Sequence, residues 1–368
     1  MQYVSLIVEC LRGRPRTVVC AVALSQAAQW ILVPVLFYSA PPGGVPTLLA
    51  IGHEFVLGSY LGPPLAFWLG ELAFRIGGAF GLYVLAQACI VLTYWAVFNL
   101  GLRIVGTRHA VLAVLLMVGI AAFAVPSPDF GPAIMAAPLW ALGLLFYWRA
   151  AIDRDRGFWF LLALDLGLLL LASYAGAILV ALMIVFTVAT PRGRAALLHP
   201  EPWIAVLPFL IVILPHAAWL KGAHDLVASG FNDTIATGKL SSGVRLCLAL
   251  AATHLGLGVL VLFAAGYPRG RKERAPLIDR NPVNALGRLF VYFFALMPMA
   301  SAIVVAFFSG RLAPFDHVSP LVVLSGLAVV TAAGDHVSLY RERMVSFTWL
   351  GLLVVPPAVI VLGIVLMP

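Results

Sequence analysis

Long apolar runs separated by short basic turns leave this chain few folds to choose from. A helix that crosses a bilayer needs about 20 apolar residues, and runs near that length recur throughout the 368 residues. Backbone polar groups in lipid must be satisfied within the chain, which favours helices over open sheets. Only 10% of the residues are charged and 62% are hydrophobic, whereas soluble domains carry about 25% charged residues. We therefore predict an all-α integral membrane protein.

The apolar runs predict about eleven transmembrane helices in one transmembrane domain, residues 1–368. The first run follows three arginines as a signal peptide would, but it is too long for the apolar part of one, so we expect it to be retained. The run from Phe158 to Val188 is too long for one span, and a turn is expected at Ser173–Gly176. The predicted spans are about 17–38, 80–102, 109–125, 130–150, 157–172, 174–190, 203–220, 243–266, 288–309, 317–334 and 346–366.

The distribution of basic residues predicts the orientation. With the N-terminus in the cytoplasm and eleven spans, most Lys and Arg residues fall in cytoplasmic loops, as the positive-inside rule requires. This accounts for the net charge of +8 without nucleic-acid binding. We expect a bacterial inner-membrane protein with a periplasmic C-terminus. Five basic residues fall on the outer side: Arg75, Lys221, Lys239, Arg245 and Arg311.

The first outer loop, residues 39–79, concentrates polar groups and is expected to contain juxtamembrane helices. Pro63 and Pro64 force a break, because proline lacks an N–H and restricts the residue before it. Apolar residues then recur at helical intervals, which predicts an amphipathic helix at the membrane surface. Glu71 and Arg75, four residues apart on that helix, are spaced to form an ion pair.

Tyr60 to Trp68, YLGPPLAFW, resembles the Y-x-x-PPL-x-x-W element of polyprenyl-phosphate-dependent glycosyltransferases of the GT-C type. These include protein O-mannosyltransferases, the aminoarabinose transferase that acts on lipid A, and bacterial family 39 sugar transferases. Three further segments, in the same order, are similar to family elements: SPDF at 127–130, LASYAGAIL at 171–179 and PHAAWL at 215–220.

The resemblance implies a GT-C-like fold and transfer of a sugar from a polyprenyl phosphate to a lipid, glycan or protein acceptor. It also implies a first-loop acid that acts as base or holds a divalent metal, and basic side chains that bind the lipid phosphate. The family's first-loop acidic pair falls here on Gly44 and Thr47, and the lysine of its K-Y element is Ser173. We expect no counterpart of the family's soluble C-terminal domain. Apart from that metal, we expect no cofactor.

The remaining polar residues of the outer loops supply the candidate site. For catalysis we select Glu54 and Asp129, since a positioned carboxylate can take the proton of an acceptor. For the donor phosphate we select Arg311 and Lys221. The residues assigned to the acceptor or its loop are His53, Tyr60, Glu71 and His224.

Each of these residues also has a structural interpretation. Glu54 can be an interfacial acid and Asp129 the cap of the helix that follows it. Arg311 can be an arginine that snorkels from a helix end, and Lys221 with His224 can belong to a solvated loop. The histidines show no H-x-x-x-H or H-E-x-x-H spacing, so we predict no metal motif.

Two other functions stay open. The missing acidic pair suits a catalytically degenerate relative that binds lipid or a partner protein as a scaffold. A transporter or flippase is the second alternative, and it would depend on Asp165, an acid within the fifth span, because an intramembrane acid is a functional candidate by default.

Overall fold

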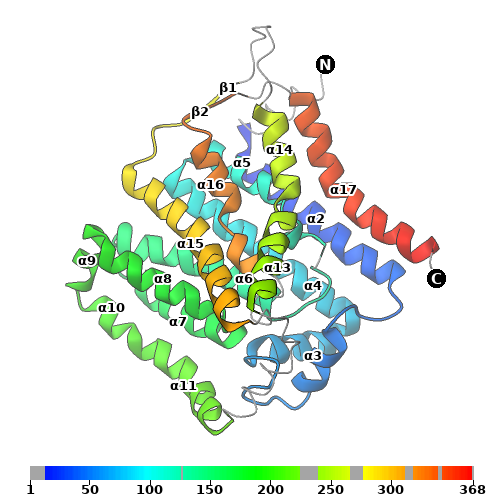
Figure 1. Ribbon diagram of the computed structural model, residues 1–368, viewed down its shortest axis with the longest axis horizontal. Coiled ribbons are helices and arrows are strands. Elements are labelled where there is room, and N and C mark those ends of the chain that lie inside the picture. The colour runs from blue at the N-terminus through cyan, green and yellow to red at the C-terminus, as the bar shows by residue number, and fades with distance from the viewer. Residues whose placement is uncertain are drawn as a thin grey trace.

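A computed structural model describes residues 13–125, 127–223, 239–265, 277–310, 318–338 and 342–366. The elements are numbered as in Figure 1. They are α2 (Pro15–Phe37), α3 (Val45–Gly52), α4 (Leu65–Ile104), α5 (Thr107–Met117), η1 (Ala121–Phe123), α6 (Pro132–Tyr147), η2 (Trp148–Ile152), α7 (Phe158–Ala172), α8 (Gly176–Ala189), α9 (Pro191–Leu197), α10 (Glu201–Ile204), α11 (Val206–Gly222), α13 (Lys239–Thr253), α14 (Leu255–Ala265), β1 (Leu277–Asp279), α15 (Ala285–Ser309), η4 (Ser319–Val322), α16 (Ser325–Ala332), β2 (His336–Ser338) and α17 (Glu342–Leu366).

The chain is an integral membrane protein built from helices, as the apolar runs predict. Six described helices are long and apolar enough to cross a membrane, or eight if each bent pair is one span. The bent pairs are α8 with α9, at 99°, and α13 with α14, at 44°. Three shorter apolar helical segments account for the other predicted runs. Crossing by all eleven remains a prediction.

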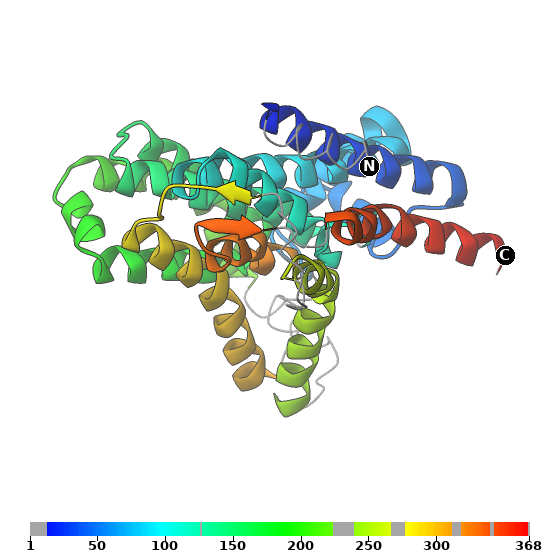
Figure 2. The same cartoon turned by 90° about the horizontal axis from the view of Figure 1, so that it is seen from above.

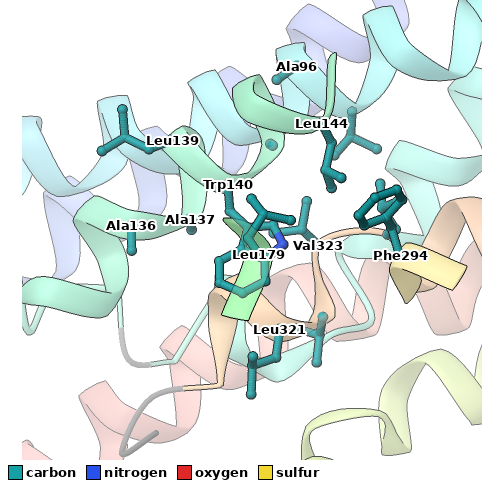
Figure 3. Packing of buried hydrophobic residues seen from close by; sticks show 14 of the residues in the cluster. Ala96, Ala136, Ala137, Leu139, Trp140, Leu144, Leu179, Phe294, Leu321 and Val323 are labelled. Carbon is teal, nitrogen blue, oxygen red and sulfur yellow. The ribbon is translucent and has the colours of Figure 1, made fainter. Parts of the chain in front are cut away.

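Helix α6 lies at the centre of the helical layer and is the most buried of the long apolar helices. Figure 3 shows its Trp140 and Leu144 packed among Leu179, Leu321 and Phe294 from α8, η4 and α15. At the end of α6, Tyr147 packs beside Phe186, Phe290 and Phe294. By contrast α11 and α17 lie at the periphery. Helices α13 and α15 pack together and project from the layer in Figure 2.

Helix α4 is divided by a kink at Gly78, which has φ +58° and ψ −146°. Only glycine adopts such a conformation without strain. Before the kink, Leu72 and Ile76 are exposed while Phe67 and Glu71 are buried, so this part is amphipathic. After it, the helix continues as the second predicted span. The kink therefore separates the amphipathic first part of α4 from the part that matches the second predicted span.

The third predicted span, 109–125, is only partly helical. Helix α5 ends at Met117, and the segment that follows, up to Gly131, is mostly irregular although largely buried. Irregular backbone at membrane depth is tolerated only inside protein or along a cavity, because its polar groups need partners. Here many of the partners are backbone groups of the same segment, paired in short turns. Two side chains of neighbouring helices add to these: Gln26 of α2 donates to the Phe123 carbonyl at 2.8 Å, and Gln87 of α4 donates to the Ser127 hydroxyl at 2.9 Å.

Ion pairs gather at the helix ends that the sequence assigns to the cytoplasm. Arg280 is the most buried of these cations, and its guanidinium binds Asp335 and the last carbonyls of α16. Beside it β1 and β2 form a two-stranded antiparallel ribbon, at the top of Figure 1, with α3 at the opposite end of the molecule. The other pairs at these helix ends are Arg103–Asp153, Arg149–Asp155 and Arg156–Glu201.

Close helix packing at Gly326 gives a stability prediction. A Cβ added to Gly326 of α16 would collide with the backbone oxygen of Ala113 in α5. Overpacking of this kind costs about 1–3 kcal/mol, so Gly326→Ala should lower the thermal unfolding temperature of the detergent-solubilised protein. Gly363→Ala in α17 is the matched control, since nothing lies within 4 Å of its Cβ position. Equal unfolding temperatures for the two variants would contradict the packing of α16 on α5.

Candidate functional site

Asp129 reaches from the loop before α6 to the start of α3. Its Oδ1 accepts a hydrogen bond from the Gly44 amide at 3.0 Å. Gly43 has φ +60°, and a Cβ there would overlap the Asp129 carboxylate. A helix N-terminus favours a negative charge, so this position suits the ionised acid. The sequence also allowed Asp129 to cap α6, but α6 begins after Gly131 without a side-chain cap.

Glu54 lies at the other end of α3. Helix α3 has eight residues, and at a rise of 1.5 Å per residue its two ends are about 10 Å apart. The Glu54 side chain is exposed, whereas Asp129 is half-buried against the first turn. The structure therefore does not bring the two predicted catalytic acids together.

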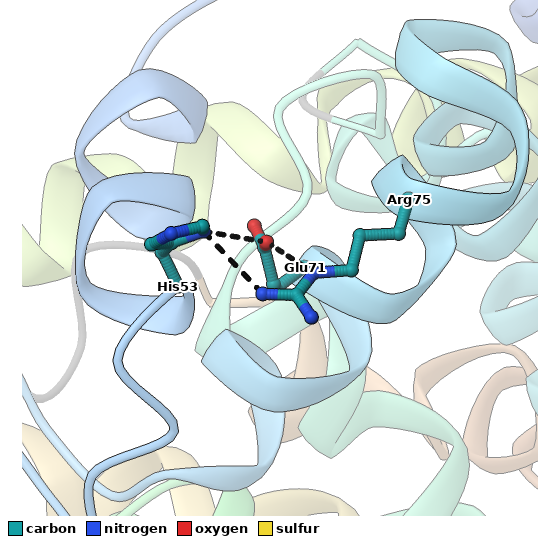
Figure 4. Close-up of polar contacts among 3 residues, drawn as sticks. All are labelled: His53, Glu71 and Arg75. Carbon is teal, nitrogen blue, oxygen red and sulfur yellow. Dashed lines mark hydrogen bonds and ion pairs between the residues drawn. The ribbon is translucent and has the colours of Figure 1, made fainter.

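Glu71 is buried and engaged by two neighbours, as Figure 4 shows. Its Oε1 accepts from Arg75 Nε at 2.7 Å and lies 3.1 Å from His53 Nδ1. The Arg75 guanidinium also lies 5.0 Å from the centre of the Phe55 ring. Glu71 thus forms the ion pair that its spacing predicts, and it joins the end of α3 to α4.

The loop that follows, residues 55–62, is held from two helices. Trp68 Nε1 of α4 donates to the Val56 carbonyl at 2.9 Å. His216 Nδ1 of α11 lies 2.6 Å from the Leu57 carbonyl. The Trp219 ring occupies the space where a Cβ at Gly58 would point. The tip of this loop is Tyr60, which is half exposed.

His216 contacts two groups, the Leu57 carbonyl and the Tyr174 hydroxyl. Burial raises the pKa of Tyr174, in the turn between α7 and α8, to about 12, so its hydroxyl keeps its proton at neutral pH. That hydroxyl lies 3.3 Å from His216 Nε2. A neutral His216 that donates from Nδ1 to Leu57 accepts at Nε2, so both contacts are satisfied by one tautomer. The sequence singled out His216 by its PHAAWL motif, but its backbone partner carries no sequence signal.

In the ranges that the structure describes, the remaining candidate site residues are not brought together. Lys221 is exposed at the end of α11, close in sequence to Trp219. Arg311 and His224 lie outside the described residues. Among the residues that the structure describes, no three His, Cys, Asp or Glu side chains gather to hold a metal ion. Asp165 of α7 is buried, and its Oδ2 has no hydrogen-bond partner in the described part of the chain.

The adjacent glycines at the start of α3 give a sharp prediction. Gly43→Ala would force a Cβ onto the Asp129 carboxylate and place alanine at positive φ, at a cost of about 1–3 kcal/mol. The Gly44 amide should then lose protection in hydrogen exchange. Gly44→Ala should leave the local structure intact, because its φ is −81° and nothing lies within 4 Å of its Cβ position. Equal protection of the residue-44 amide in both variants would contradict this contact.

Comparison with known proteins gives three findings. The family model for dolichyl-phosphate-mannose-protein mannosyltransferases matches residues 62–219, from the PPL element to the PHAAW motif. The crystal structure of ArnT from Cupriavidus metallidurans, bound to undecaprenyl phosphate, superposes with a TM-score of 0.60 at 15% sequence identity. That match covers 86% of this chain and 59% of ArnT, so the chain spans less than two thirds of the ArnT length.

The apo oligosaccharyltransferase of Archaeoglobus fulgidus has a TM-score of 0.49 at 15% identity, over 95% of this chain and 55% of that one. No curated protein sequence matches. The resemblance read from the Tyr60–Trp68 element is confirmed: this membrane protein has a GT-C-like fold and resembles the dolichyl-phosphate-mannose-protein mannosyltransferases over residues 62–219.

Proposed function

We propose that the protein transfers a sugar from a polyprenyl-phosphate donor to a lipid, glycan or protein acceptor, with the Asp129 carboxylate as the general base. One observation carries the proposal. The resemblance assigns part of the family's acidic pair to Gly44, and the Asp129 carboxylate lies 3.0 Å from the Gly44 nitrogen. The Asp129 carboxylate therefore lies against the backbone of the segment where the first loop lacks an acid, on the side of the Gly43 Cβ position.

Asp129 would act as a general base. Its Oδ1 is held by the Gly44 amide at 3.0 Å, and a carboxylate positioned in this way can take the proton of an attacking hydroxyl. The acceptor oxygen would bond to C1 of the sugar as the bond from C1 to the phosphate breaks, and the polyprenyl phosphate would leave. The ArnT structure, solved with undecaprenyl phosphate, supports this donor class.

The leaving phosphate needs positive charge nearby. We assign this role to Lys221 and Arg311. Lys221 is close in sequence to Trp219, which packs against the loop at Gly58, and Arg311 directly follows Gly310, the residue that ends α15. If a divalent cation takes part, Asp129 and the donor phosphate are the ligands that such a cation would prefer.

The membrane placement of the site and its acceptor loop are proposed from the predicted topology. The chain would form one transmembrane domain over residues 1–368, with the site on the outer face of a bacterial inner membrane. Residues 39–79 would form the loop on which the acceptor rests. Tyr60, His53 and Glu71 would then shape the acceptor side, with His224 near Lys221.

A catalytically degenerate scaffold is the second candidate. The absence of the first-loop acidic pair at Gly44 and Thr47 favours it, as does the engagement of Glu71 by Arg75 and His53. The two readings differ in outcome, because a scaffold would bind the lipid donor without turnover.

Asp129→Asn separates these readings. Loss of a general base costs about 100- to 10,000-fold in rate, so the variant should lose most activity while Glu54→Gln keeps it. The measurement is release of undecaprenyl phosphate by purified protein in liposomes, from undecaprenyl-phosphate mannose or undecaprenyl-phosphate aminoarabinose, with a membrane lipid extract as acceptor.

Two results would contradict the assignment. Loss of activity in Glu54→Gln, with Asp129→Asn active, would move the base to the far end of α3. Donor binding by the wild type without any release would instead establish the scaffold.

A further inference from the structure

We infer that Gln87 and Ser127 are positioning residues for Asp129, a role that rests on the proposed function. Neither residue belongs to the candidate site by sequence pattern. Gln87 lies within the apolar second span, and Ser127 precedes Asp129 by two residues. Their contacts connect the membrane part of α4 to the loop that carries the acid.

The first step is the hydrogen bond between them. Gln87 is 1% exposed, and its Nε2 donates to Ser127 Oγ at 2.9 Å. Ser127 is fully buried, and its hydroxyl donates onward to the Ala124 carbonyl at 2.7 Å. The Ser127 amide donates to that same carbonyl at 3.1 Å. Gln87 thus fixes a closed turn that ends two residues before Asp129.

The second step is that the loop is also fixed on both sides of this turn. Gln26 donates to the Phe123 carbonyl at 2.8 Å, and Tyr94 orients Gln26 through a 3.0 Å hydrogen bond. After Asp129, the Phe130 ring is 1% exposed and packs near Leu48 of α3 and Gly70 of α4. Asp129 is therefore held between two buried anchors, which restrict the places its carboxylate can reach.

The third step is the energetic cost of Gln87. Its Oε1 is buried and has no hydrogen-bond partner among the described residues. A buried polar atom without a partner is destabilising, and an apolar side chain of similar length would avoid that cost. A residue that breaks a local packing rule is expected at a functional site. The amide is explained if its N–H group is needed to place Ser127 and, through it, Asp129.

Position matters strongly for a general base. A displacement of about 1 Å at a reacting group can cost about 100-fold in rate. Removal of the Gln87–Ser127 hydrogen bond would let the 124–129 segment shift, and the contact between Asp129 and the Gly44 amide would loosen. The effect should fall on kcat and leave KM nearly unchanged, because neither residue is placed to touch the donor or the acceptor.

The test uses Gln87→Met, Ser127→Ala and the double variant in the full chain. Methionine is unbranched like glutamine but cannot make the hydrogen bond. Thr93→Val is the matched control, because Thr93 is fully buried on the same helix and, within the described part of the chain, its hydroxyl bonds only to the Cys89 carbonyl of that helix. Undecaprenyl phosphate release gives kcat and KM, and hydrogen exchange followed by mass spectrometry reports on the peptide that contains Gly44.

We expect each single variant to lose about 10- to 100-fold in kcat, with KM changed less than about threefold. The Gly44 peptide should exchange faster. The double variant should resemble Ser127→Ala, because both single variants remove the Gln87–Ser127 hydrogen bond and Ser127→Ala also removes the one to the Ala124 carbonyl. Thr93→Val should match the wild type in kcat and in Gly44 exchange.

Folded variants with wild-type kcat would overturn the inference, and so would additive losses in the double variant. If the wild type shows no turnover, the proposed function is wrong, but the hydrogen-exchange measurement still tests the positioning role. Unchanged Gly44 exchange in Gln87→Met would show that Gln87 does not position Asp129.

Discussion

Backbone polar groups inside an apolar bundle need hydrogen-bond partners. The segment after α5 is mostly irregular, so regular helical hydrogen bonds do not supply all of its partners. Helix α5 stops at Met117, and the carbonyls that follow are bound partly by N–H groups of local turns and partly by side chains from other helices. Gln26 and Gln87 serve the Phe123 carbonyl and the Ser127 hydroxyl from two different helices. Both amides sit in otherwise apolar faces, so they also fix how α2 and α4 are rotated about this segment.

The geometry of the candidate site follows from that arrangement. Once the segment is fixed, Asp129 emerges beside the first turn of α3, and glycines allow the close approach. Gly43 leaves room for the carboxylate, while Gly52 and Gly70 let α3 lie against the surface part of α4. The kink at Gly78 then turns α4 from the surface into the bundle. The position of the acid therefore depends on buried amides and on missing side chains as much as on Asp129 itself.

The sequence predicted the helices better than the contacts. Apolar runs locate the spans because lipid imposes one simple rule on length and hydrophobicity. The Asp129–Gly44 contact joins residues 85 positions apart, and glycine offers no side chain to signal it. The Glu71–Arg75 pair was predictable because both residues lie on one helix. Gln26 and Gln87 are recognisable in the sequence as amides within apolar runs, but they carry no charge that would mark them as site residues.

A missing motif residue need not mean a missing function. Transfer chemistry requires a carboxylate at a defined place, and the same place can be supplied from another part of the chain. Glu71 is less suited to act as the general base. Its Oε1 is 2.7 Å from Arg75 Nε and 3.1 Å from His53 Nδ1, so it is engaged in an ion pair that joins α3 to α4. Asp129 instead lies at the N-terminus of α3, where a negative charge is stabilised, and its Oδ1 accepts a hydrogen bond from the Gly44 amide. Geometry thus favours Asp129 over the acids that lie nearer the PPL element in sequence.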